Sequence, residues 1–148
     1  MKQRIRSGFT LVELLIVIII GAVLASIAIP KFNTAWRSSS ESRLRENLKE
    51  YRNAIERYHS DTGFYPATMS DIRAQSAPAN ALDANGVSRQ IPDGTWNGPY
   101  LKFYPSTNAI YPDLRAIGYS YGIASPTVGK LFINSSNRDL NGARYNTW

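Results

Sequence analysis

The chain has 148 residues and no cysteine, so it holds at most one small domain besides its N-terminal segment, and it excludes disulfides, thiol catalysis and Cys-ligated metals. Its single histidine, His59, also excludes a multi-histidine metal site. The formal net charge is +6, but the densest basic stretch, residues 43–52, is interleaved with Glu, which is typical of a solvated helix face and not of a nucleic-acid-binding stripe.

The first element in chain order is an apolar segment at residues 9–30, which follows the basic residues Lys2, Arg4 and Arg6. Its 22 residues contain a single charge, Glu13. As a helix the segment would be roughly 33 Å long, enough to cross a bilayer core of about 30 Å. The basic residues ahead of it predict a cytoplasmic N-terminus.

Two general interpretations fit an apolar segment at this position. One is a secretory signal peptide cleaved at a small-residue site such as Ser26-Ile27-Ala28, and the other is a plain membrane anchor. Glu13 argues against both, because a carboxylate inside an apolar helix costs roughly 2.5–3.5 kcal/mol on insertion scales and rarely lies there without a partner. Glu13 does not exclude a signal peptide, however. A secreted β-rich binding protein with an ordinary cleaved signal peptide stays open as the alternative interpretation.

The residues at the start of the apolar segment resemble a known processing signal. Gly8-Phe9-Thr10-Leu11-Val12-Glu13 is similar to the leader junction of type IV pilins and type II secretion pseudopilins. The resemblance implies a leader of residues 1–8, cleavage between Gly8 and Phe9, and N-methylation of Phe9. It also implies that Glu13 neutralises the N-terminal amine of a neighbouring subunit. Physical chemistry agrees, because an ammonium and a carboxylate buried in an apolar filament core each need the other.

The helix is expected to continue past the membrane half, residues 9–30, into an amphipathic half at residues 31–60. Five apolar residues recur there at helical spacing and form one stripe: Leu44, Leu48, Tyr51, Ile55 and Tyr58. We expect the helix to end near Asp61-Thr62-Gly63, because Gly63 can adopt the left-handed capping conformation.

Three places in this helix are weak helix formers. Pro30 stands where the pilin family has its helix-bending proline, and the other two places are Ser26 and Ser38–Ser40. These residues predict a local bend or a melted turn.

Residues 61–148 are expected to form a β-rich globular region. Ser70–Gln75 is predicted to be a short helix capped by Ser70, and residues 76–95 a surface loop. The predicted strands lie at residues 100–104, 118–123 and 130–134, with the last two joined as a hairpin. A three-stranded antiparallel sheet packed on the apolar stripe gives an α+β fold. The resemblance implies a type IV pilin-like fold, shaped like a ladle or lollipop.

Two later segments extend the resemblance. Residues 58–66 and 96–102 are similar to segments of the major pseudopilins, the second to their Trp-x-Gly-Pro-Tyr-Leu-Lys sequence. The Asp-Pro-Trp-Gly stretch that normally follows is missing. A surface pilus and a secretion pseudopilus therefore both stay open.

Asn137, Asp139 and Asn141 alternate oxygen-bearing side chains before Gly142, as calcium loops do. Major pseudopilins use calcium to hold a disulfide-free C-terminal loop, so calcium is one interpretation of this pattern. An ordinary Asn/Asp-rich turn is the other, because no acidic residue follows Gly142 to complete a calcium loop.

The sequence shows no catalytic constellation and no phosphate-binding glycine loop, so we expect a structural subunit and not an enzyme. The resemblance implies four kinds of partner: identical subunits in a helical filament, a prepilin peptidase and methyltransferase, an inner-membrane assembly platform with its ATPase, and the lipid bilayer before assembly. The expected location is the bacterial inner membrane, with a single pass, followed by a periplasmic pseudopilus or an extracellular pilus. Nucleic acid is not an expected partner.

Overall fold

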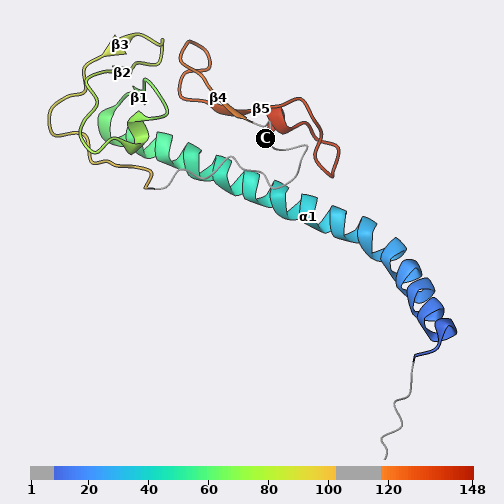
Figure 1. The fold of residues 1–148 in the computed structure, drawn as a ribbon. Coiled ribbons are helices and arrows are strands. Elements are labelled where there is room, and N and C mark those ends of the chain that lie inside the picture. Colours follow the sequence, from blue (N-terminus) through green and yellow to red (C-terminus); the bar gives the residue numbers. More distant parts are fainter. Residues whose placement is uncertain (1–8, 103–117) are drawn as a thin grey trace, which may run out of the picture. The chain divides into compact units, whose positions relative to one another are not determined.

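The computed structural model describes residues 9–102 and 118–148. Contacts divide the chain into two compact units, Met1–Arg37 and Ser38–Trp148. One helix, α1 (Leu11–Thr62), runs through both units, and small antiparallel sheets follow it (Figure 1). This arrangement confirms the α+β class and the type IV pilin-like fold.

The 52-residue helix α1 confirms the single long helix predicted from the sequence. It ends at Thr62, and Gly63 follows with a φ of 76° while its amide donates to the carbonyl of His59 at 2.8 Å, as a left-handed cap requires. The helix continues through Pro30 and through Ser38–Ser40, so the melted turn is wrong. The bend at Pro30 stays a prediction.

The strands differ from the predicted single sheet. Strands β1 (Tyr65–Pro66), β2 (Ala81–Leu82) and β3 (Ser88–Arg89) form one antiparallel sheet in that order. Strands β4 (Gly118–Tyr121) and β5 (Leu131–Asn134) form a separate antiparallel pair. The predicted hairpin of the last two strands is thus confirmed, whereas the single three-stranded sheet is wrong for the described residues.

The predicted strand at residues 100–104 is not formed over residues 100–102. Its backbone has another partner, because the amides of Tyr100 and Leu101 both donate to the carbonyl of Ile72, at 2.8 and 3.0 Å. Two donors on one carbonyl anchor this segment but leave no ladder of strand hydrogen bonds. Residues 103 and 104 lie outside the described part of the chain.

The predicted surface loop at residues 76–95 contains the β2–β3 hairpin. Asp83 organises its turn, since Oδ1 accepts the amides of Asn85 and Val87, each at 2.9 Å. The Val87 amide is the main reason why the pKa of Asp83 lies below its usual value. The polar composition that indicated a loop therefore belongs to a hairpin turn.

The predicted helix Ser70–Gln75 is a single 3-10 turn, Asp71–Arg73. Ser70 makes no side-chain capping bond. Asp71 instead accepts the amide and the hydroxyl of Thr68, at 2.7 and 2.9 Å. The Ser70 cap is therefore wrong, and the carboxylate one residue later closes the turn.

Within Ser38–Trp148, the core forms around the apolar stripe of α1. All five predicted stripe residues are buried, and Tyr51 and Tyr58 are fully inaccessible. Leu131 and Ile133 of β5 belong to the same core, so one face of this strand packs with the stripe. Each such aliphatic side chain contributes about 1.5–3 kcal/mol on burial, which explains how the unit holds together without disulfides.

Candidate functional site

The first half of α1 exposes apolar side chains all around the helix. Every large hydrophobic residue from Leu11 to Phe32 is between 48 and 82% exposed. By length and composition this part of α1 can cross a membrane. A helix that is apolar on every side is stable only in lipid or in a protein core, so this surface requires an apolar environment that the described chain itself does not supply.

Glu13 lies in the first turn of α1, where it closes a capping box with Thr10. Its Oε2 atom accepts the Thr10 amide at 2.9 Å and the Thr10 hydroxyl at 2.7 Å, while the Glu13 amide donates back to the hydroxyl at 3.2 Å. This arrangement supplies partners at a helix start where backbone amides have none of their own. We did not predict the role of Thr10, although the Thr-x-x-Glu spacing is a recognised signal for it.

The other residues of the predicted processing site are placed as follows. Phe9 precedes α1 and is 78% exposed. Gly8 lies outside the described residues. Pro30 lies inside α1, and its carbonyl accepts the hydroxyl of Thr34 at 3.1 Å. The structure therefore brings Thr10 and Glu13 together beside an accessible Phe9.

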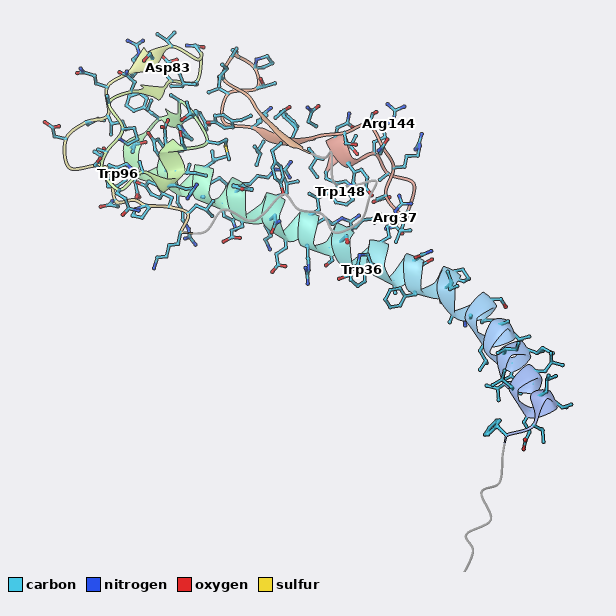
Figure 2. All side chains as sticks on the ribbon, viewed as in Figure 1. Trp36, Arg37, Asp83, Trp96, Arg144 and Trp148 are labelled. Atoms are coloured by element: carbon cyan, nitrogen blue, oxygen red, sulfur yellow. The ribbon has the colours of Figure 1, made fainter. Side chains whose placement is uncertain are left out.

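An aromatic pair, which we did not predict, follows the apolar segment. Phe32 and Trp36 are one helical turn apart, and their rings stack with centroids 5.7 Å apart at an interplanar angle of 30°. They are 65 and 42% exposed, and Figure 2 labels Trp36 on α1 beside Arg37. Aromatic rings with basic neighbours are typical of the level where a membrane helix meets water.

The predicted calcium ligands lie in the loop after β5. Asp139 is buried, whereas Asn137 and Asn141 are exposed. Both carboxylate oxygens of Asp139 accept hydrogen bonds from the protein: Oδ1 from the amides of Asn141 and Ala143, and Oδ2 from Arg45 of α1 at 2.7 Å. The described residues contain no cluster of three His, Cys, Asp or Glu side chains that could hold a metal. These residues therefore do not fit a calcium ion as they are arranged.

A model of the prokaryotic N-terminal methylation motif matches residues 3–29. Type II secretion system core protein G of Escherichia coli (strain K12) is 30% identical over 121 residues, which cover 78% of this chain and 81% of that protein. The protein of the same name from Pseudomonas aeruginosa is 26% identical and covers 80% of this chain and 87% of its own length. Fimbrial protein EcpC of Eikenella corrodens is 32% identical over 59% of this chain and 63% of its own length.

No solved structure matches the chain. The family assignment therefore depends on the sequence relatives and on the methylation motif, which coincides with the exposed apolar start of α1 and its Thr10–Glu13 box. The chain belongs to the type II secretion system core protein G family of pseudopilins.

Proposed function

We propose that this chain is the structural subunit of a type II secretion pseudopilus, which forms from the inner membrane as a helical filament. The observation that carries this proposal is the exposed apolar surface on the first half of α1. Lipid would cover this surface before assembly, and other subunits would cover it afterwards. The names of the relatives favour the pseudopilus over a surface pilus, and the related fimbrial protein is the reason to test both.

Assembly then exchanges lipid contacts for contacts between the same helices of successive subunits. Such head-to-tail contacts do not close on themselves and therefore produce a helical filament. The sequence contains no phosphate-binding glycine loop, so an ATPase of the assembly platform would supply the energy. A prepilin peptidase and methyltransferase would first convert Gly8-Phe9 into a methylated Phe9 terminus. We assign no catalytic role to the chain.

Deleting the gene in the bacterium that carries it should stop the release of folded proteins by type II secretion. These proteins should then accumulate in the periplasm, since the filament that moves them outward is missing. Immunoblots of periplasm and medium for a secreted enzyme measure the effect, and the wild-type gene on a plasmid should restore release. Normal secretion together with a loss of surface filaments would instead identify the chain as a pilus subunit.

The Phe32–Trp36 pair predicts how deep the stored subunit lies in the bilayer. The apolar segment before it is roughly 33 Å long, so the pair should reach the headgroup level on the periplasmic side. In vesicles, lipids brominated near the headgroup should quench Trp36 fluorescence more strongly than lipids brominated near the chain end. Wild-type protein is compared with Trp36→Phe, because the difference isolates Trp36 from Trp96 and Trp148. If no brominated lipid quenches the emission that this difference assigns to Trp36, the side chain lies in water.

A further inference from the structure

The loop between β5 and the 3-10 helix Tyr145–Thr147 is tied to α1 by charged side chains. Inside the loop, Asp139 Oδ1 accepts the amides of Asn141 and Ala143 at 2.9 and 2.8 Å. The Asp139 amide also donates to the Ala143 carbonyl at 2.8 Å. These bonds give the loop a fixed shape around one carboxylate, and they leave Oδ2 directed at the helix.

Arg45 supplies the positive charge that this carboxylate needs. Its Nη2 atom donates to Asp139 Oδ2 at 2.7 Å, and the side chain of Asp139 is only 1% exposed. The Arg45 guanidinium also lies 4.1 Å from the centroid of the Trp148 ring. A planar cation that binds a carboxylate while it stacks on an indole is held in one orientation from two sides.

Glu41, one helical turn before Arg45, binds the same loop from α1. Both of its carboxylate oxygens accept the Leu140 amide, at 3.1 and 3.2 Å, and Oε1 also accepts the Tyr145 hydroxyl at 2.8 Å. Glu41 is 5% exposed and Tyr145 is 1% exposed, so the bond between their side chains lies away from water. All four oxygens of the two carboxylates in this region thus have donors on the protein.

A calcium ion takes six to eight oxygen ligands at about 2.3–2.6 Å. To reach Asp139 it would have to displace Arg45, and to reach Glu41 it would have to displace the Leu140 amide. The negative charge of Asp139 is also already neutralised, because the Arg45 guanidinium binds it as a calcium ion would. The contacts therefore contradict the calcium interpretation of the Asn-x-Asp-x-Asn pattern.

We infer that the Arg45 guanidinium takes the place of a calcium ion in this pseudopilin and closes the C-terminal loop on α1 without metal. The subunit then reaches its folded state in media that lack calcium. A second guanidinium, that of Arg52, binds the chain on either side of this loop, because it donates to the carbonyl of Leu131 in β5 at 2.8 Å and to that of Trp148.

The first test uses wild-type full-length protein in detergent micelles. Its Tm should differ by less than about 1 °C between millimolar calcium and chelator, because an ion raises Tm only when the folded state binds it. Isothermal titration with calcium chloride should likewise show no binding heat. A rise of several degrees with calcium would overturn the inference, and this measurement does not depend on any variant folding.

The second test compares Arg45→Gln with Arg43→Gln, a change two residues away on the same helix that keeps the Arg45–Asp139 ion pair. Arg45→Gln should lower Tm by about 5 °C or more, because it leaves the buried Asp139 carboxylate without its cation. Hydrogen exchange at the Asn141 and Ala143 amides should also become faster in Arg45→Gln and stay unchanged in Arg43→Gln. Equal behaviour of the two variants would contradict the role of Arg45. Neither test requires a filament, so both are independent of the proposed function.

Discussion

Replacing Glu13 with Gln should abolish entry of the subunit into filaments and leave its insertion into the membrane intact. In the filament core the carboxylate is proposed to pair with the amine of Phe9 of a neighbouring subunit. Gln removes the charge, and an ammonium left unpaired in an apolar core costs about 3–5 kcal/mol. That cost corresponds to a loss of roughly 100-fold or more in assembly. Immunoblots of sheared filaments and of membranes measure the two effects.

The structure offers a second role for Glu13, and the choice of Gln separates the two. In the free subunit Glu13 accepts the amide and hydroxyl of Thr10 through Oε2. Gln can also close a capping box, so Glu13→Gln keeps the helix start and removes only the charge. Thr10→Ala does the reverse and should cost about 1 kcal/mol of helix stability without blocking assembly. If Glu13→Gln enters filaments normally while Thr10→Ala blocks them, capping and not charge pairing is the role of Glu13.

The features of α1 that follow from local sequence were predictable. The spacing of the stripe from Leu44 to Tyr58 shows which face is buried, because helical periodicity alone decides it. Gly63 indicates the end of the helix for the same kind of reason, since its conformational freedom is a property of one residue. The uniform apolar surface of the first half likewise depends only on composition.

The sheets were harder to predict, because strands β1, β2 and β3 have two residues each and are too short to show alternation. Tyr100 and Leu101 have strand-like composition, yet their amides find the carbonyl of Ile72, a partner that no local pattern reveals. Clusters of aromatic residues led to the prediction of strands. Whether such a cluster forms a strand depends on the hydrogen-bond partners that the fold brings to its backbone.

The calcium interpretation likewise came from a local pattern, and the proposed replacement of the ion by Arg45 depends on a distant residue. The pattern Asn137, Asp139, Asn141 shows which side-chain oxygens are present but not which donors or ions bind them. The occupant of Asp139 is Arg45, 94 residues earlier in the chain. In the sequence Arg45 looks like one member of a mixed-charge helix face, and only the fold gives it a separate role.

Replacing Gly8 with a bulky residue such as Val should leave the subunit unprocessed and prevent filament assembly completely. The uncleaved chain keeps Lys2, Arg4 and Arg6 ahead of the apolar helix. Each of these charges would cost several kcal/mol inside an apolar filament core. Phe9 would also carry a peptide amide in place of the amine that Glu13 is proposed to neutralise. Mass spectrometry should find the precursor, retaining residues 1–8, in the membrane fraction.

Ser7→Ala is the matched control, because it changes the leader beside the same peptide bond and keeps the glycine. It should yield the mature chain, which starts at a methylated Phe9 and enters filaments.

The same spectra decide between the two interpretations of the apolar segment. A mature chain that starts near Ile29 in both variants would mean that the segment is a signal peptide. Glu13 would then be lost with it, and the carboxylate could not serve assembly. A start at Phe9 keeps Glu13 in the mature protein, four residues from the amine that its equivalent in a neighbouring subunit is proposed to neutralise.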